Sequence, residues 1–268
     1  MSVNLSDQKT DHASDVLISF DGPVATVEIN KPPHNFFSIP LIRQLADAFE
    51  DLEADRRCHA IVLAARGTAF CAGADFSNRE ATPAQRSPRA LNPIYDEAIR
   101  LFACNKPVVA AVHGAAVGGG LGLALVADFR VTCAEAKFSA NFNRLGFHPG
   151  FGLSVTLPRL VGVQQAAMLF YTGRRIAGEE AVAIGLADLL VPQAKVRAEA
   201  ARLALEIAIS APLAVQATRA TLRVGLVEQI RLAVARESAE QNAQFKTEDF
   251  KEGVAAMAAR REPVFKGE

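Results

Sequence analysis

The sequence predicts an α/β fold with a helical C-terminal region, and three observations lead to this prediction. Short runs rich in valine and isoleucine recur along the first half of the chain, and such β-branched runs are typical of buried strands. Helical segments lie between these runs, which is the pattern of strands joined by helical crossovers. From residue 193 to 262, amphipathic segments follow one another without a strand-like run.

The chain has 268 residues, enough to bury a large core in one main domain with an appendage. Residues 1–15 are polar and mixed in charge, so we expect a flexible tail there and no signal peptide. We assign the core domain to 16–192 and a helical region to 193–268. The helical region is too thin to hold a core alone, so we expect it to pack on the core domain or on another subunit.

Composition argues against several classes of partner. Lys plus Arg and Asp plus Glu each number 29, so the zero net charge does not predict a face that binds nucleic acid. The four cysteines stand singly, which predicts neither a metal site nor a disulfide framework and fits a reduced cytoplasm. Residues 108–127 are apolar and long enough to span a membrane. His113-Gly114 and a glycine turn divide them, so we expect a buried strand there and no membrane span.

Five strands are expected from the β-branched runs, at 16–20, 24–29, 60–65, 108–112 and 129–134. Asp21-Gly22-Pro23 is a turn signal between the first two strands.

The first helix is expected over 38–53, with Ser38 as its N-cap. Its apolar face consists of Leu41, Leu45, Ala48, Phe49 and Leu52. Residues 76–96 are polar and carry three prolines, which favours a mobile loop or short helices at the edge of the fold. Further along, Pro192 and Pro212 mark helix starts.

Two of the strands are followed by small residues and then by a helix start. RGTAFCAGADF (66–76) follows the strand at 60–65, and HGAAVGGGLGLALVAD (113–128) follows the strand at 108–112. Small residues let a ligand approach the backbone, and a helix N-terminus offers unpaired N–H groups. Neither a P-loop nor a dinucleotide-binding pattern is present. Two such turns side by side could hold one oxyanion.

With these turns in place, the sequence resembles the enoyl-CoA hydratase/isomerase family, the crotonases. The resemblance covers most of the chain. The segments that carry it are INKPPHNFFS, IVLAARGTAFCAGADF, KPVVAAVHGAAVGGGLGLALVADFRVTCAEAKFS, LGFHPGFGLSVTLPRLVG and YTGRRIAGEEAVAIGLADLLVP. The resemblance implies a crotonase (ClpP-like) spiral of strand-strand-helix repeats. It also implies C-terminal helices that trimerise, and usually a hexamer built from two trimers.

The resemblance further implies that the backbone N–H groups of Ala74 and Gly119 form an oxyanion hole for the thioester carbonyl of an acyl-CoA. The family's reactions place negative charge on that oxygen, and two preorganised donors in a dry pocket stabilise it by roughly 3 kcal/mol or more. Backbone donors need only small side chains around them, which accounts for the glycines. Coenzyme A enters as part of the substrate, and we expect no further cofactor and no metal.

Two carboxylates of the family's hydratases are missing. In those enzymes one glutamate stands three residues after the oxyanion glycine and another four residues after the Phe of AKF; together they hold the attacking water. Here these positions are Gly122 and Phe142. A positioned acid or base contributes about 10²- to 10⁴-fold in rate, so we expect no efficient conventional hydratase.

His148 is the candidate replacement for the missing acid-base groups. It lies two residues before Gly150, whose backbone faces the catalytic water in the hydratases, and histidine is the commonest general base. The alternative is that its ring hydrogen-bonds a backbone carbonyl and has only a structural role.

The resemblance places coenzyme A near the AGAD loop, near the segment before the second helix and near the terminal VFKG. The residues expected to bind substrate or coenzyme A are Lys31, Arg66, Ala72, Asp75, Gly118, Gly122, Phe142, Gly150 and Lys266. Alternatively, the three cations are solvated surface charges and Asp75 caps the next helix.

The leading hypothesis is a cytoplasmic acyl-CoA lyase or isomerase of fatty acid metabolism that stabilises a thioester enolate. Isomerisation, carbon-carbon cleavage and hydration by another route all remain open. One alternative is a catalytically inactive CoA-binding or scaffolding homologue, and another is an enoyl-CoA hydratase that uses other residues. An RNA-binding role lacks a predicted basic face, and a serine hydrolase lacks the G-x-S-x-G pattern.

Overall fold

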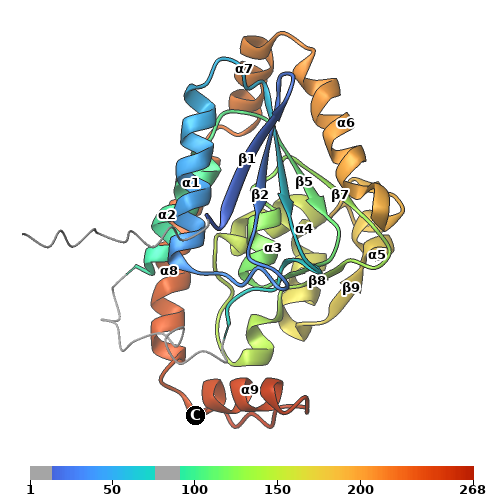
Figure 1. Ribbon diagram of the computed structural model, residues 1–268. Helices are drawn as coiled ribbons and strands as arrows, with labels where there is room; N and C mark the ends of the chain where they lie inside the picture. Colours follow the sequence, from blue (N-terminus) through green and yellow to red (C-terminus); the bar gives the residue numbers. More distant parts are fainter. Residues whose placement is uncertain (1–13, 76–90) are drawn as a thin grey trace, which may run out of the picture.

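The structure is a computed structural model that describes residues 14–75 and 91–268, and it shows helices arranged around two sheets (Figure 1). The strands are β1 (Val16–Asp21), β2 (Val24–Ile29), β3 (Ala60–Ala65), β4 (Ala69–Cys71), β5 (Val108–Val112), β6 (Ala115–Val117), β7 (Phe129–Thr132), β8 (Lys137–Ser139), β9 (Arg175–Ala177) and β10 (Leu189–Leu190). The α-helices are α1 (Ile39–Ala54), α2 (Pro93–Ala103), α3 (Gly119–Ala124), α4 (Leu153–Thr172), α5 (Gly178–Ala183), α6 (Val196–Ala208), α7 (Pro212–Leu222), α8 (Leu226–Gln244) and α9 (Glu248–Ala258). Two short 3₁₀ helices are η2 (Asn141–Leu145) and η3 (Gln193–Lys195).

The larger sheet has six strands in the order β1-β2-β3-β5-β7-β10. β1 and β2 are antiparallel and joined through the predicted turn, in which Gly22 has a φ of +54°. The other neighbours are parallel. β3 and β5 are buried at every position, as expected for β-branched strands covered on both faces.

The smaller sheet has the order β4-β6-β8-β9, with only β9 antiparallel to its neighbour. Along the chain, β3-β4-α2 and β5-β6-α3 each give one strand to the larger sheet, one to the smaller sheet, and then a helix. This arrangement agrees with the expected strand-strand-helix repeat. It also sets β4 and β6 side by side, together with the turns that follow them.

The predicted strands and the first helix are confirmed with small changes at their ends. Ser38 caps α1, and its Oγ accepts from the Leu41 N–H at 3.3 Å. The strand expected over 129–134 ends at Thr132, because Cys133 already belongs to a turn closed by the Ala136 N–H. The tail at 1–13 and most of the polar segment 76–96 lie outside the described residues, and from Pro93 the chain is helical.

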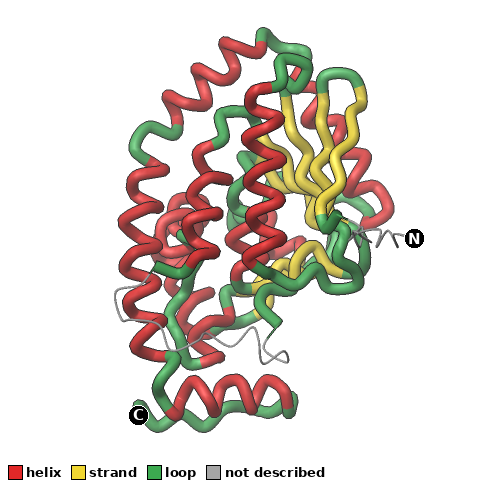
Figure 2. Tube along the Cα trace, turned by 60° about the vertical axis from the view of Figure 1, so that its left-hand side comes forward, coloured by secondary structure: helices red, strands yellow, loops and turns green. Residues whose placement is uncertain are grey.

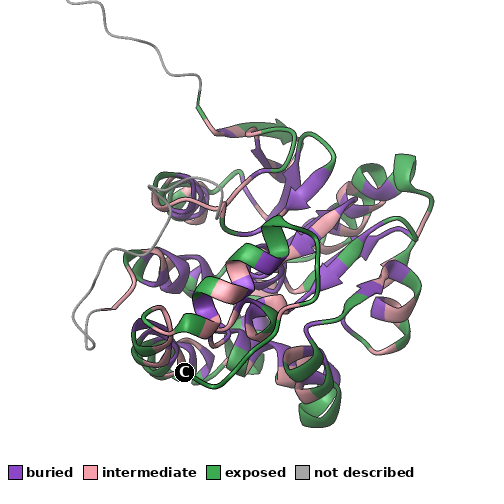
Figure 3. Ribbon diagram, turned by 90° about the horizontal axis from the view of Figure 1, so that it is seen from below, coloured by how far each residue is buried: buried purple, intermediate pink, exposed green. Residues whose placement is uncertain are grey.

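Helices cover the larger sheet and the site region from several sides. α6 packs on β3 and β5, while α1 packs against α2 (Figure 1). α8 lies against α2 and α4, and α9 crosses beneath them and contacts η2 (Figure 2). Seen from below, the inner strands are buried, whereas β1 at the edge of the sheet is largely exposed (Figure 3). No helix in the described ranges is long and apolar enough to cross a membrane.

The C-terminal helices pack on the core through polar as well as apolar contacts. Asp128, after α3, accepts from Arg219 of α7 at 2.7 Å and from Arg223 at 3.1 Å. Buried or nearly buried ion pairs of this kind need good geometry to offset the loss of hydration, and both arginines also donate to backbone carbonyls. Pro212 occupies the first turn of α7, as predicted.

Candidate active site

The site begins where β4 and β6 end. These parallel strands place Ala69 opposite Ala115 and Cys71 opposite Ala116, so their following turns leave the sheet at the same edge. Gly73 in the first turn has a φ of +85°. A Cβ at this position would lie 2.7 Å from the carbonyl oxygen of Val117. Only glycine allows this approach, which brings the turns together.

Among the described residues, each turn presents one backbone N–H group that has no protein acceptor. Ala74 forms an isolated parallel bridge with Phe37, and Gly119 is the first residue of α3, where helical N–H groups have no partner in the helix. The flanking donors are engaged: the Gly118 N–H bonds the Ser139 oxygen at 2.9 Å, and the Gly122 N–H bonds the Gly118 oxygen at 3.2 Å. Within residues 14–75 and 91–268, the Ala74 and Gly119 N–H groups donate to no protein atom.

Close packing explains the glycines of α3. A side chain at Gly120 would overlap the carbonyl of Cys71, so this glycine lets α3 lie directly on β4. A Cβ at Gly119 would lie 3.1 Å from the ring of Phe37. The Gly119 N–H is therefore bordered by an aromatic ring.

Phe151 fills the space beside Gly122, one of the two positions at which the resemblance predicts a missing glutamate. A Cβ at Gly122 would lie 2.7 Å from Phe151 Cδ1. The Phe151 side chain is 1% exposed, and its ring meets that of Phe37 edge to face at 5.0 Å. Its φ of +63° is rare for a bulky residue and carries backbone strain. The fold therefore holds an aromatic ring where an acid side chain would have to pass.

Phe142, the other position at which a missing glutamate is expected, belongs to an aromatic cluster that reaches the C-terminal helices. Its ring meets Phe147 at 5.4 Å, and Phe147 in turn meets Phe245 at 5.1 Å and Phe250 at 5.7 Å. The ring also borders the turn before α3, because Phe142 Cζ lies 3.7 Å from a Cβ built on Gly118. Phe142 thus links the edge of the site to α8 and α9.

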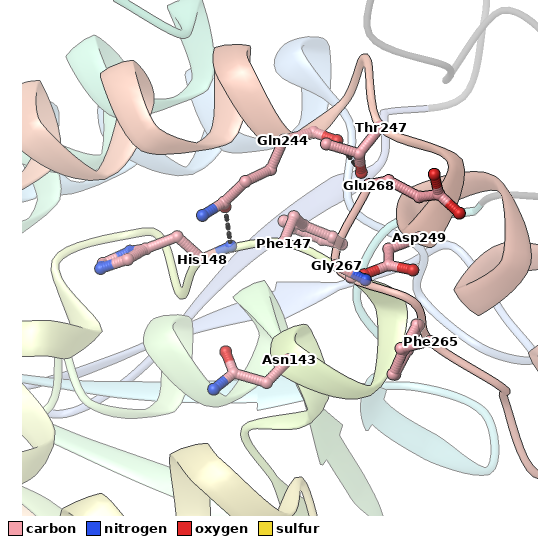
Figure 4. A pocket seen from close by; sticks show the side chains of 10 residues that line it. Asn143, Phe147, His148, Gln244, Thr247, Asp249, Phe265, Gly267 and Glu268 are labelled. Carbon is pink, nitrogen blue, oxygen red and sulfur yellow. Dashed lines mark hydrogen bonds between the residues drawn. The ribbon is translucent and has the colours of Figure 1, made fainter.

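His148 lines a cavity of about 410 Å³ between η2, the end of α8 and the C-terminal tail (Figure 4). Its Nδ1 lies 2.7 Å from the Pro149 carbonyl oxygen, and its backbone N–H donates to Gln244 at 2.6 Å. A carbonyl only accepts, so Nδ1 carries the proton and a neutral ring keeps its lone pair on Nε2. Neither Ala74 nor Gly119 is among the described residues that line this cavity.

Gly150 contacts two polar residues that sequence reasoning missed. A Cβ at this position would overlap the hydroxyl of Tyr95 and lie 2.6 Å from Gln241 Nε2. Tyr95 donates to Gln241 Oε1 at 2.8 Å, and Gln241 donates to the His148 carbonyl at 2.8 Å. Only the contacts of the folded chain identify this network, since Tyr95 and Gln241 lie on α2 and α8.

Glu237 of α8 is a buried carboxylate that the sequence did not single out. It accepts from the Gly152 N–H at 2.8 Å and from the N–H and hydroxyl of Ser154 at 3.1 and 2.5 Å. Burial raises the pKa of this carboxyl, while these hydrogen bonds oppose the rise. Its partners lie at the start of α4, so it caps that helix.

The three basic residues that we expect to bind coenzyme A lie in two places, near the turn that follows β4 and in the C-terminal tail. Arg66 Nε pairs with Glu28 at 3.0 Å, and Lys31 Nζ lies 3.7 Å from Asp15. Lys266 is exposed in the tail, where its backbone N–H donates to Asp249.

Ala72 and Asp75, which were also expected to bind substrate or coenzyme A, lie on either side of Gly73 and Ala74 in the first turn. The Ala72 N–H donates to the His34 oxygen at 3.0 Å, and Asp75 ends the first described range.

A spiral of strand-strand-helix repeats with paired glycine-rich turns defines the class of protein, and comparison with known proteins agrees. The family model for enoyl-CoA hydratase/isomerase matches residues 19–268. A crystal structure of an enoyl-CoA hydratase/isomerase from Pseudoalteromonas atlantica superposes with a TM-score of 0.85 at 29% identity, covering 94% of this chain and all of that one. The chain belongs to the enoyl-CoA hydratase/isomerase family.

Individual relatives carry the same family name. A Mycobacterium tuberculosis protein named "Probable enoyl-CoA hydratase" is 38% identical over 256 residues, covering 91% of this chain and 98% of the relative. The crotonyl-CoA hydratase of Syntrophomonas wolfei is 32% identical over 253 residues, covering 93% and 97%. The chain is thus an enzyme of this family by its relationships.

Proposed function

We propose that this protein acts on an acyl-CoA thioester and stabilises its enolate with the backbone N–H groups of Ala74 and Gly119. The observation that carries the proposal is this pair of N–H groups, which have no acceptor among the described residues and lie on two turns that Gly73 holds together. An enolate places negative charge on the thioester oxygen, and fixed donors stabilise that charge without reorganising. Family membership supports coenzyme A as the handle of the substrate.

We further propose that the reaction is not hydration by the two-glutamate route. Gly122 and Phe142 lack carboxyl groups, and the ring of Phe151 occupies the space beside Gly122. Loss of two positioned acid-base groups, each contributing about 10²- to 10⁴-fold, leaves a weak hydratase. Isomerisation or carbon-carbon cleavage needs an enolate but no attacking water, which favours these two reactions.

His148 is the proton carrier that we propose, because its Nε2 has no hydrogen-bond partner among the described residues and its lone pair can act as the base. In an isomerisation, Nε2 would take a proton from an acyl carbon while the bonding electrons move to the thioester oxygen. Collapse of the enolate would then return the proton at another carbon. Turnover that survives His148→Ala unchanged would remove this assignment.

The binding of coenzyme A and the assembly of subunits complete the proposal. Lys31, Arg66 and Lys266 would supply positive charge, and Ala72 and Asp75 would border the ligand. We propose a trimer or a hexamer of two trimers, supported by exposed apolar side chains on the C-terminal helices. The four free, buried cysteines support a reduced, cytoplasmic setting.

The test is turnover and binding of crotonyl-CoA, longer enoyl-CoAs, 3-enoyl-CoAs and aromatic acyl-CoAs, with calorimetry on the same samples. We expect binding throughout, and turnover of a 3-enoyl or aromatic ester well above hydration of crotonyl-CoA. Ordinary hydration of crotonyl-CoA would contradict the proposal and favour a hydratase that uses other residues.

A second candidate function is a CoA-binding scaffold without catalysis. The replacement of both glutamate positions favours it, whereas the intact pair of turns argues against it. In the same experiment, binding of every ester without turnover of any would favour the scaffold.

A further inference from the structure

One face of α8 holds the segment that carries His148. Glu237, Gln241 and Gln244 follow one another about one helical turn apart, which places them on the same side of the helix. Glu237 accepts from the Gly152 N–H at 2.8 Å, whereas both glutamines bond the backbone of His148 itself. α8 thus holds this segment at more than one point, and it holds His148 twice.

Both backbone polar groups of His148 are bound by side chains of α8. Its N–H donates to Gln244 Oε1 at 2.6 Å (Figure 4), and its carbonyl oxygen accepts from Gln241 Nε2 at 2.8 Å. The backbone at His148 cannot turn without breaking one of these hydrogen bonds, and a buried group left unpaired is costly. The two glutamines therefore fix the direction in which the His148 side chain leaves the backbone.

The direction of each hydrogen bond follows from the groups involved. A backbone N–H only donates and a carbonyl only accepts, so Gln244 presents its oxygen to His148 and Gln241 presents its amide N–H. Gln241 Oε1 then accepts from the Tyr95 hydroxyl at 2.8 Å. Gln241 and Tyr95 are both buried, at 2% and 5% exposure. Tyr95 thus sets which end of the Gln241 amide faces His148.

We propose that Gln241 and Gln244 are positioning residues, which hold His148 in the orientation that proton transfer at Nε2 needs. The inference rests on the proposed function, because it takes His148 as the proton carrier. With the backbone held, Nδ1 of the ring stays on the Pro149 carbonyl oxygen at 2.7 Å, and Nε2 faces away from it. A displacement of about 1 Å at a reacting group can cost about 10²-fold in rate. The glutamines act through His148 and touch no substrate.

The first experiment measures isomerisation of 3-hexenoyl-CoA by the full chain, with kcat and KM determined separately. Gln244→Met keeps the length of the side chain but removes the acceptor, so kcat should fall at least about 10-fold while KM stays within about 3-fold. Gln244→Glu keeps an oxygen acceptor, so its kcat should stay within about 3-fold of the wild type. Gln241→Met should show the same loss as Gln244→Met; if it does not fold, the two variants at the half-buried Gln244 still test the inference.

Two controls separate positioning from a purely structural role. Ser154→Ala removes a hydroxyl that donates to Glu237 at 2.5 Å, so it weakens another contact between α8 and the same segment without touching His148. It should lower the melting temperature about as much as Gln244→Met does, yet leave kcat within about 3-fold. In a His148→Ala background, Gln244→Met should change the residual kcat less than about 2-fold, because the residue that it positions is gone.

A further measurement needs no turnover. Long-range ¹H–¹⁵N spectra at about pH 8, where an ordinary imidazole is neutral, report which ring nitrogen of His148 carries the proton. We expect the Nδ1–H form in the wild type and in Gln244→Glu. Gln244→Met should give a mixture of both forms, because the ring is no longer held on the Pro149 carbonyl.

Three results would overturn the inference. Equal losses of kcat for Gln244→Met, Gln244→Glu and Ser154→Ala would mean that α8 only stabilises the fold. Full kcat in both methionine variants would mean that His148 needs no such support. An undiminished effect of Gln244→Met in the His148→Ala background would assign the effect to another group. If the wild type did not turn over the 3-enoyl ester, or if His148→Ala kept full kcat, the proposed function would fail; the ring spectra, which need no substrate, distinguish that failure from a failure of the positioning.

Discussion

At the scale of single residues, phenylalanine rings occupy the two places where the sequence comparison predicts that acid-base groups are missing. Phe142 joins an aromatic cluster, and Phe151 presses on Gly122 with a strained backbone at a φ of +63°. Such strain persists only where the surrounding packing enforces it. A glutamate side chain placed at position 122 by a single substitution would therefore collide with the ring of Phe151 before it could reach a substrate.

This contact predicts a coupling between positions 122 and 151. Gly122→Ala should destabilise the wild type by about 1–3 kcal/mol, because an added methyl group overpacks the core against Phe151. In a Phe151→Ala background most of that cost should vanish, since the ring is gone. Urea unfolding of the double-mutant cycle measures the coupling, and a Phe147→Ala background serves as control. If the two substitutions changed the free energy of unfolding additively, the side chains at positions 122 and 151 would not be in contact as the structure shows.

The cysteines allow a second prediction at this scale. Burial raises the pKa of Cys71 and Cys104 to about 12, and it raises the pKa of Cys58 and Cys133 as well. Thiolate is the reactive form, so the native protein at pH 7 should resist alkylation, and unfolding in urea should release all four thiols. Rapid labelling of the native protein, followed by mass spectrometry, would contradict this burial.

At the scale of elements, long regular segments were predictable and short ones were not. β3 and β5 stand out as uninterrupted apolar runs, and α1 has both an N-cap and an apolar face. β4, β6 and β8 have three residues each, too few for any alternation to show. The sequence located the turns after β4 and β6 through their small residues. It could not show Phe151 beside Gly122, because that contact joins segments brought together only by folding.

The aromatic cluster predicts how α9 is held. Phe250→Ala removes a buried ring that meets Phe147 and Phe245, so α9 should open far more often while the sheet stays intact. Hydrogen exchange of the α9 amides should speed up at least about 10-fold relative to those of β3. Phe265→Ala, in the exposed tail, is the control. Equal acceleration in α9 and β3 would mean that α9 does not open independently.

At the scale of the whole molecule, the C-terminal helices leave large apolar side chains uncovered. Leu213, Leu222 and Val224 are 81%, 70% and 79% exposed, and all lie in or just after α7. A patch of this kind fits the contact between subunits that we propose. Leu213→Glu should therefore shift the protein to a smaller species in analytical ultracentrifugation. Ile18→Glu, on the exposed face of β1, should not; an unchanged mass for Leu213→Glu would place the interface elsewhere.

The most direct test of the account is a comparison of Gly119→Pro with Gly119→Ala. Both variants place a Cβ against Phe37, and proline is tolerated in the first turn of a helix, but only proline removes the N–H. On the acyl-CoA that the wild type turns over best, the oxyanion hole predicts a loss of about 10²- to 10³-fold in kcat for Gly119→Pro and only a few-fold for Gly119→Ala. Equal losses, or full activity of the proline variant, would contradict a catalytic role for the Gly119 N–H.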